Sequence, residues 1–315
     1  MTTHYVIGFT GTIASGKTVR CHRLLQAAIN HQLSALHSAS KTGKKSKVSV
    51  EEALQLASTT ALAGQKSTAF SASYLPLLQD SPLSVKYINA DLLGHSVYLP
   101  GTPCYYQLIQ RFGERILMRE EAQGGAATAS LGDSDSLRRS GNTVPSRADV
   151  IFSASPPPIN RHVLGKIVFA DLQELSALNA ICWPHIMEAF KAQYSSCVLA
   201  AQESGKRVTL FILEAALLLE IAGMLRYCTD VWITSCSEEE AASRLALRNG
   251  LGAAEVAQRI TAQASLFEKI KTLRRIEFAN GLKHFNTSET TLDEGLRQVD
   301  LVFEKYWRDK IKPWL

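Results

Sequence analysis

The sequence contains no closely spaced cysteine pair and no long uncharged apolar run. Its six cysteines are scattered without a C-x-x-C motif, so neither a zinc site nor a disulfide framework is indicated, and a reducing compartment fits best. The most apolar stretch, residues 210–225, includes Glu214 and Glu220 and is too short and too charged to span a bilayer. We therefore expect neither a secreted disulfide scaffold nor a membrane partner.

A basic leader and a dominant charge are also missing. No basic residues precede the first apolar run, so the cytoplasm is the expected location. The 34 Lys and Arg residues exceed the 29 Asp and Glu residues only slightly, and the net charge of +5 suits an anionic small molecule as readily as nucleic acid. With 46% hydrophobic and 20% charged residues, the composition is that of a soluble globular protein. We expect a small-molecule substrate and no nucleic-acid partner, and the sequence leaves the oligomeric state open.

Two stretches differ in composition from the rest of the chain. Residues 31–84 are rich in Ser, Ala, Thr and Leu and include a basic run at 41–47, whereas residues 119–158 collect Gly, Ser, Ala, Arg and three successive prolines. We interpret both as insertions, and the basic run as a solvated loop rather than a nucleic-acid patch or a localisation signal. The remaining residues suit a single α/β domain that spans 1–315.

The rest of the sequence alternates β-branched or aromatic runs with amphipathic helical patterns. This alternation predicts a doubly wound, five-stranded parallel sheet with helices on both faces. Two S/T-x-x-E capping boxes, Ser237 with Glu240 and Thr291 with Glu294, predict the start of a pair of lid helices at 237–265 and of a C-terminal helix at 291–308. The five predicted strands are 5–10, 85–89, 208–213, 231–234 and 283–285.

The first predicted strand leads directly into a phosphate-binding motif. Residues 11–18 read GTIASGKT, a full G-x-x-x-x-G-K-S/T pattern followed by a helical pattern at 19–28. Such a loop directs backbone N–H groups and the positive end of a helix dipole at phosphate oxygens. Lys17 would neutralise the β- and γ-phosphates of ATP, and the Thr18 hydroxyl would be a ligand of Mg²⁺. The predicted nucleotide contacts are Gly11, Ala14, Ser15, Gly16, Lys17, Thr18 and Val19.

The phosphate-binding motif alone leaves motor, GTPase, transport ATPase and small-molecule kinase open. No N-K-x-D motif stands in a position to read guanine, which argues against a GTPase. Arg244 and Arg248 are four residues apart and therefore share one helix face. Short helices with spaced arginines favour a lid that closes over nucleotide phosphates.

From the second predicted strand onward the sequence resembles the dephospho-coenzyme A kinase family. The segments INADLLGH at 88–95, YLPGTP at 98–103 and FGERIL at 112–117 follow the family's D-A-D, P-G-x-P and F-G motifs in order. Further matches follow at 161–169, 178–184, 217–220, 244–251 and 259–263. The resemblance extends from residue 5 to about residue 307 and omits both insertions.

This resemblance implies transfer of the γ-phosphoryl group of ATP to the 3′-hydroxyl of dephospho-coenzyme A, the last step of coenzyme A biosynthesis. It implies a P-loop kinase core with a helical substrate-binding subdomain at 102–204. Asp91 matches the second Asp of D-A-D and would be the base or the orienting group for the ribose hydroxyl. His95 would flank the substrate, and Arg161 would meet a substrate phosphate. A helix cap for Asp91 and a structural role for His95 are the alternatives.

The resemblance also assigns the lid arginines. Arg248 would act with Lys17 on the transferring phosphoryl group, and Arg244 and Arg259 would contact nucleotide phosphates. A solvated helix face is the alternative for Arg244 and Arg248. The chain departs from the family pattern at Ala14 in place of Gly, Asn89 and Glu214 in place of Asp, Trp183 in place of His, and Asn249 in place of Asp.

Two other functions stay open at this point. Another P-loop nucleoside or metabolite kinase would keep Lys17 and Thr18 but would not need the P-G-T-P segment. A catalytically impaired nucleotide-binding protein would be expected to lose Asp91 early, and the sequence retains Asp91.

Overall fold

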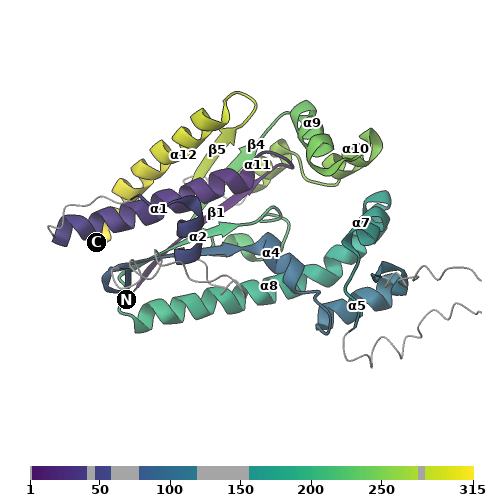
Figure 1. Ribbon diagram of the computed structural model, residues 1–315, viewed down its shortest axis with the longest axis horizontal. Coiled ribbons are helices and arrows are strands. Elements are labelled where there is room, and N and C mark those ends of the chain that lie inside the picture. The colour runs from purple at the N-terminus through teal and green to yellow at the C-terminus, as the bar shows by residue number, and fades with distance from the viewer. Residues whose placement is uncertain (1, 41–46, 58–77, 119–155, 276–280) are drawn as a thin grey trace, which may run out of the picture. The chain divides into compact units, whose positions relative to one another are not determined.

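The structure is a computed structural model that describes residues 2–40, 47–57, 78–118, 156–275 and 281–315. Its centre is a five-stranded sheet in the order β2-β3-β1-β4-β5, in which every neighbouring pair is parallel (Figure 1). All five predicted strands are confirmed. They are β1 (Thr3–Gly11), β2 (Leu83–Asn89), β3 (Val208–Glu214), β4 (Asp230–Ser235) and β5 (Leu282–Asn286).

The order of the strands determines where a ligand can bind. β1 lies in the middle of the sheet, with β3 on one side and β4 on the other. The chain therefore turns in opposite directions on the two sides of β1, and in an open parallel sheet the crevice at the carboxyl end of such a strand is the usual ligand site. The phosphate-binding motif follows β1 at this point.

Helices cover both faces of the sheet, as a doubly wound fold requires. Leu210 and Ile212 of β3 belong to one core cluster with α1 (Lys17–Ser40) and α12 (Leu292–Tyr306), which lie side by side in Figure 1. Phe211 lies between them in sequence and packs instead against Tyr194 of α8 (Leu172–Glu203), with ring centroids 4.6 Å apart. Because successive side chains of a strand point to opposite faces, α8 covers the other face.

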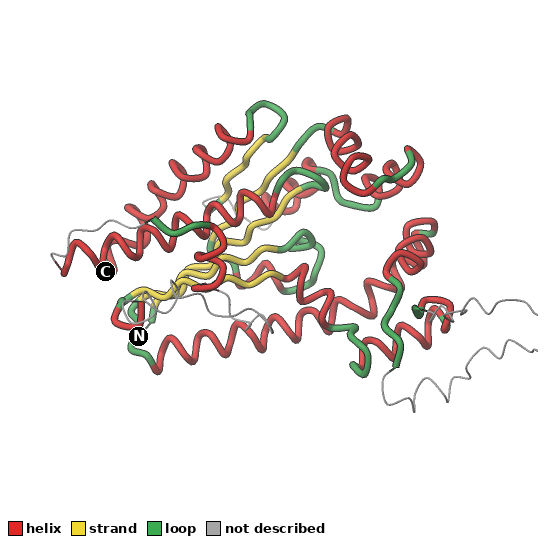
Figure 2. The backbone as a smooth tube through the Cα atoms, in the orientation of Figure 1, coloured by secondary structure: helices red, strands yellow, loops and turns green. Residues whose placement is uncertain are grey.

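The remaining helices are short (Figure 2). Among the described residues, no helix is long and apolar enough to cross a membrane. Besides α1, α8 and α12, the α-helices are α2 (Val50–Ala57), α4 (Ala90–Ser96), α5 (Pro103–Phe112), α7 (Arg161–Ala170), α9 (Glu238–Asn249), α10 (Ala253–Thr261) and α11 (Leu266–Arg275). Single 3-10 or π turns occur at Glu114–Ile116, Met224–Tyr227, Trp307–Ile311 and Lys312–Trp314.

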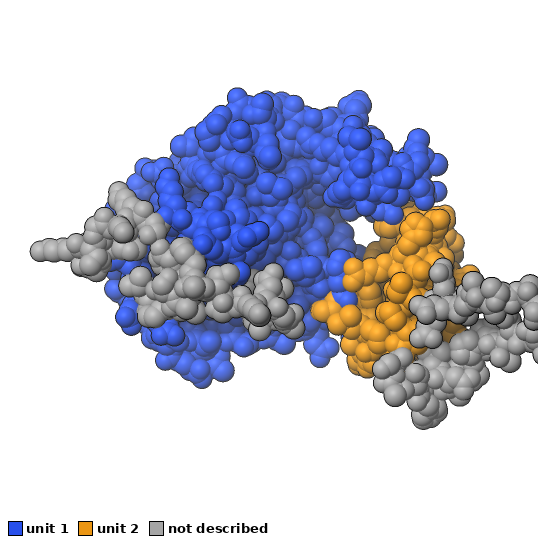
Figure 3. Space-filling view, in the orientation of Figure 1, with its two compact units in different colours: residues 1–95, 183–315 blue, residues 96–182 orange. Residues whose placement is uncertain are grey.

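The chain divides into two compact units, which Figure 3 shows in different colours. Unit 1 comprises residues 1–95 and 183–315 and contains the whole sheet. Unit 2, Ser96–Cys182, contains α5, α7 and the start of α8. The predicted subdomain at 102–204 extends further, because the residues of α8 from Trp183 onward belong to unit 1.

The first predicted insertion, 31–84, differs from the structure at both ends. α1 continues to Ser40, and β2 already begins at Leu83. Between them, Val48, Ala53 and Ala57 are buried in the same core cluster as α1 and α12. The described parts of this stretch therefore pack into the core of the fold, and their status as an insertion stays a prediction. Residues 41–46 and 58–77, and residues 119–155 of the second predicted insertion, lie outside the described residues.

The predicted helix starts are confirmed. The Ser237 side chain accepts a hydrogen bond from the Glu240 N–H at the start of α9. At the start of α12, Thr291 and Glu294 form a reciprocal capping box. The predicted lid segment, 237–265, therefore contains α9 and α10.

Candidate active site

The loop between β1 and α1 has the backbone shape of a phosphate-binding loop. Gly16 has φ +69°, and Ala14 has φ +55°, a left-handed conformation that costs a residue with a Cβ about 1–2 kcal/mol. Gly11 is required because a Cβ there would lie 2.2 Å from the Thr234 Oγ1. The loop therefore tolerates strain at Ala14, the position where the sequence departs from glycine.

Hydrogen bonds hold this loop in place. The Ser15 hydroxyl lies 2.7 Å from the Thr12 carbonyl oxygen and 2.7 Å from the Thr234 hydroxyl of β4. The Thr12 N–H donates to the Thr234 carbonyl oxygen at 3.0 Å. Arg244 of α9 donates to the Ala14 carbonyl oxygen at 3.2 Å. The loop is thus held in place by contacts with β4 and with α9.

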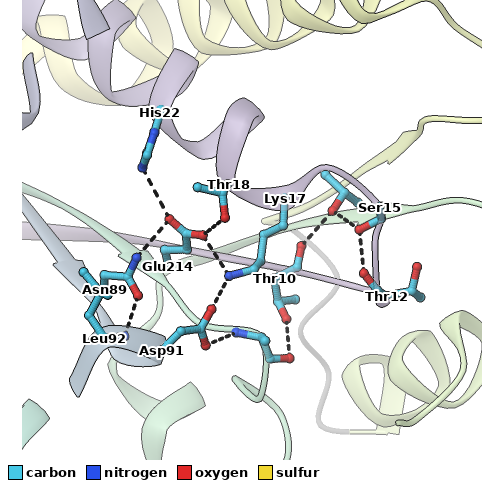
Figure 4. A network of polar contacts seen from close by, with 12 residues as sticks. Thr10, Thr12, Ser15, Lys17, Thr18, His22, Asn89, Asp91, Leu92 and Glu214 are labelled. Carbon is cyan, nitrogen blue, oxygen red and sulfur yellow. Dashed lines mark hydrogen bonds and ion pairs between the residues drawn. The ribbon is translucent and has the colours of Figure 1, made fainter. Parts of the chain in front are cut away.

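Lys17, the first residue of α1, lies between two carboxylates (Figure 4). Its ammonium donates to Asp91 and, at 2.8 Å, to Glu214 Oε1. Only 13% of the Lys17 side chain is exposed. Burial alone would lower the pKa of Lys17, but the charges of Glu214 and Asp91 and their hydrogen bonds raise it above its ordinary value. Lys17 is therefore charged at neutral pH.

Glu214, at the carboxyl end of β3, is the buried centre of this network. Its side chain is 1% exposed. Oε1 accepts from Lys17 and from the Thr18 hydroxyl at 2.6 Å, and Oε2 accepts from the Tyr87 hydroxyl at 2.6 Å. Burial works to raise the pKa of this carboxyl, but the Lys17 charge and the three hydrogen bonds hold that pKa below its ordinary value. Glu214 is therefore a carboxylate with its two oxygens in different roles.

Asp91 lies in the first turn of α4 and faces the phosphate-binding loop. One oxygen accepts from the Ala216 N–H at 2.9 Å, and the other accepts from Lys17. The helix cap is a different residue, because Asn89 Oδ1 accepts from the Leu92 N–H at 3.0 Å. The Asp91 side chain is 37% exposed. The position of Asp91 is thus explained by its contact with Lys17 and not by capping.

The donor set beside the loop fits a magnesium ion. Mg²⁺ prefers oxygen ligands, keeps several waters, and in P-loop proteins takes the loop Ser/Thr hydroxyl and an acid at the end of a neighbouring strand. Thr18 and Glu214 are such a pair and lie in contact. Among the described residues, no group of three or more His, Cys, Asp and Glu side chains is arranged as a metal site. The residues present therefore fit a magnesium ion shared with a ligand, not a closed protein cage.

The other predicted site residues are more dispersed. Arg244 joins α9 to the end of β5 through the Thr287 hydroxyl at 3.0 Å, besides its contact with the loop. Arg248 is exposed and donates to Asn249 at 2.9 Å. Arg259 is half-buried on α10, His95 is exposed on α4, and Val19 is exposed on α1. Arg161 belongs to unit 2, where its guanidinium lies 5.6 Å from the centre of the Tyr98 ring.

Sequence reasoning missed two members of this network as site residues. Glu214 appeared only as a departure from a family motif, although an acid that ends an apolar strand beside β1 is a usable signal. Tyr87 gave no signal, since a tyrosine in a strand most often fills the core. Only the pairing of β2 with β3 places it next to Glu214.

The sequence is similar to those of curated dephospho-CoA kinases. The family model described as dephospho-CoA kinase matches residues 148–280. The curated dephospho-CoA kinase of Carboxydothermus hydrogenoformans is 29% identical over 189 residues, which cover 60% of this chain and 71% of that protein. That of Geobacter metallireducens is 29% identical over 187 residues, which cover 59% of this chain and 72% of that protein.

Two solved structures are similar over most of their length. TT1252 from Thermus thermophilus has a TM-score of 0.46 and 18% identity, and covers 96% of this chain and 98% of that chain. Dephospho-CoA kinase from Campylobacter jejuni has a TM-score of 0.39 and 13% identity, and the match covers 96% of this chain and 97% of that chain. Because both scores are below 0.5, the fold assignment rests on the strand order and pairing described above. In sequence, the chain is therefore similar to curated dephospho-coenzyme A kinases over about 60% of its length.

Proposed function

We propose that the protein transfers the γ-phosphoryl group of ATP to the 3′-hydroxyl of dephospho-coenzyme A and releases coenzyme A and ADP. The observation that carries this proposal is the contact of the Lys17 ammonium with Asp91 and Glu214. It connects the loop lysine with a carboxylate that would bind the metal ion and with a candidate base. The sequence similarity to curated dephospho-CoA kinases supports the choice of acceptor.

The triphosphate would bind at the loop. Backbone N–H groups of the loop and of the first turn of α1 point to the same region, where the helix dipole favours negative charge. Lys17 supplies a full positive charge at the β- and γ-phosphates. Thr18 and Glu214 would hold Mg²⁺, and the bound ion would neutralise charge on the β- and γ-oxygens.

Asp91 would orient and deprotonate the acceptor. The ribose hydroxyl oxygen attacks the γ-phosphorus, its proton passes to the Asp91 carboxylate, and the bond from the γ-phosphorus to the bridging oxygen of ADP breaks. The Ala216 N–H fixes one Asp91 oxygen, so the orientation of the carboxylate is set by the backbone after β3. The partial exposure of Asp91 allows an acceptor to reach it.

The remaining assignments stay predictions within this proposal. Arg248 would stabilise charge on the transferring phosphoryl group, and Arg244 and Arg259 would contact the nucleotide. His95 would flank the substrate, and Arg161 would bind a substrate phosphate. A cytoplasmic location and the lack of a nucleic-acid partner belong to the same proposal.

A comparison of acceptors tests the proposal. The full chain is incubated with ATP and Mg²⁺ and with dephospho-coenzyme A, adenosine or pantetheine phosphate, and ADP release and product mass are measured. We expect ADP and a product with the mass of coenzyme A with dephospho-coenzyme A only. Lys17→Met is the control and should abolish transfer. Phosphorylation of only the other two acceptors would favour a different metabolite kinase, and ATP binding without transfer to any acceptor would favour the impaired nucleotide-binding protein.

A further inference from the structure

Arg20 is a buried cation that has no hydrogen-bond or ion-pair partner for its side chain in the part of the chain that the structure describes. It lies on α1 one helical turn after Lys17, and only 3% of the residue is exposed. Within the described ranges, its side chain makes no hydrogen bond or ion pair, and its Nε atom is fully buried with no acceptor. Guanidinium groups stay charged in proteins, so this burial is costly unless an anion compensates it.

Arg23, on the same helix, differs from Arg20 because its guanidinium has a carboxylate partner. Its Nε donates to Asp300 Oδ1 at 2.8 Å and its Nη2 donates to Asp300 Oδ2 at 2.5 Å, so both prongs of the guanidinium bind one carboxylate. Arg20 packs against the same helix, α12, and has no such acid among the described residues. Burial and the nearby charge of Arg244 both lower the pKa of Arg20, as expected for a cation without a counter-ion.

The fold leaves space for the Arg20 guanidinium. A Cβ at Gly295 of α12 would lie 2.3 Å from Arg20 Nη2 and 3.1 Å from Cζ. Glycine inside a helix is destabilising relative to alanine, so this position carries a cost that makes room for the guanidinium. On its other side, Nη1 would lie 2.8 Å from a Cβ at Gly16. The guanidinium therefore lies between α12 and the phosphate-binding loop.

The side chains of Arg20 and Lys17 lie on opposite sides of β1. Lys17 reaches the acids at the ends of β2 and β3. Arg20 lies beside α12, which follows β5, and near Arg244, whose α9 follows β4. If the γ-phosphate lies beside Lys17 and Asp91, the α-phosphate and the nucleoside extend toward β4 and β5.

We propose that Arg20 binds the α-phosphate of the nucleotide through its guanidinium. This inference rests on the proposed function only in taking ATP as the ligand of the loop. The missing counter-charge of Arg20 is then supplied by two oxygens of a phosphate, which a guanidinium binds in bidentate geometry. Arg20 thereby becomes a binding residue on the side of the loop opposite the transferred group.

The test compares wild type with Arg20→Met in the full chain without acceptor. The dissociation constants of ATP, ADP, AMP and adenosine are measured, together with the Tm of the nucleotide-free proteins. We expect Arg20→Met to bind the three nucleotides about 10- to 100-fold more weakly than wild type, which is the range of a charge-assisted hydrogen bond. Its affinity for adenosine should be unchanged. The Tm of nucleotide-free Arg20→Met should equal or exceed that of wild type, because an uncompensated buried charge is removed.

Two matched variants separate binding from packing. Arg23→Met should lower the Tm and leave the nucleotide constants unchanged, because its partner is Asp300. Gly295→Ala should weaken ATP binding in wild type by displacing the guanidinium, and should not weaken it further in Arg20→Met.

The inference would be overturned if Arg20→Met bound all three nucleotides with the dissociation constants of wild type. It would also be overturned if adenosine lost affinity to the same extent, or if only ATP lost affinity. If Arg20→Met does not fold, Arg20→Gln is measured in the same way, and a lower Tm with unchanged nucleotide binding would also overturn it. Coenzyme A formation by wild type is a separate measurement. If it is absent while Arg20→Met still loses nucleotide affinity, the proposed function fails and the inference stands.

Discussion

At the scale of residues, the candidate site depends on how one carboxylate is held. Glu214 presents Oε1 to Lys17 and Thr18, while the Tyr87 hydroxyl holds Oε2 from the other side. A side chain with both oxygens engaged cannot rotate without breaking hydrogen bonds. The metal-binding oxygen of the proposed site is thus kept in place by β2, a strand that contributes nothing to the phosphate-binding loop itself.

This arrangement predicts a pH dependence of stability. The folded-state pKa of Glu214 is below its ordinary value, so its contribution is complete above that ordinary value and is lost as the pH falls through the folded pKa. Glu214→Gln should lower the free energy of unfolding at pH 7 by about 3 kcal/mol, because Lys17 loses a buried partner. Below about pH 4 the difference from wild type should shrink.

Urea unfolding at a series of pH values from 7 to 3 measures this difference. Glu203→Gln, which changes an exposed acid at the end of α8, is the control and should follow wild type throughout. A Glu214→Gln curve parallel to that of wild type over the whole range would show that the Glu214 carboxylate contributes no linked stability.

Part of the candidate site could be predicted from the sequence. The contiguous motif predicts the loop residues, Lys17 and Thr18, and the family resemblance predicts Asp91. The use of Asn89 as the cap of α4, which frees Asp91 to face Lys17, could not be predicted, since both side chains are capable caps. The choice depends on the backbone after β3, which supplies the Ala216 N–H to Asp91.

At the scale of elements, α2 is the clearest difference between sequence and structure. The Ser- and Ala-rich composition around it favours an insertion, yet Ala53 and Ala57 are fully buried in the cluster beneath α1 and α12. Small side chains permit close helix packing, and composition does not distinguish that use from a solvated segment. At the start of α12, the apolar residue Leu292 is exposed, whereas Gly295 is buried against Arg20, so apolar character alone does not identify the buried face.

The packing of α2 gives a prediction for stability. Ala53→Asp should lower the free energy of unfolding by about 3 kcal/mol or more, because it places an unpaired charge in the core. Glu51→Gln on the exposed face of the same helix should change it by less than about 0.5 kcal/mol. Urea unfolding at pH 7 measures both variants. An Ala53→Asp protein as stable as wild type would mean that α2 does not belong to the core.

At the scale of the whole molecule, the five strands and a doubly wound parallel sheet were predicted from the sequence, whereas the order of the strands came from the structure. Continuous apolar runs such as β3 and β4, buried at every position, are typical of a parallel sheet with both faces covered. The division into two units was predicted less closely, because α8 continues as one helix across the boundary at Trp183, although Pro184 follows it directly. The burial of Arg20 had no signal, since it depends on a glycine 275 residues later in the chain.

The central claim is that the Asp91 carboxylate directs the acceptor hydroxyl at a phosphoryl group held beside Lys17. The most direct test measures turnover of dephospho-coenzyme A and the dissociation constant of ATP for wild type, for Asp91→Asn and for Asp293→Asn, an exposed control on α12. The account predicts that Asp91→Asn keeps its ATP affinity and loses about 10²- to 10⁴-fold in turnover, while Asp293→Asn matches wild type. Unchanged turnover in Asp91→Asn would contradict it.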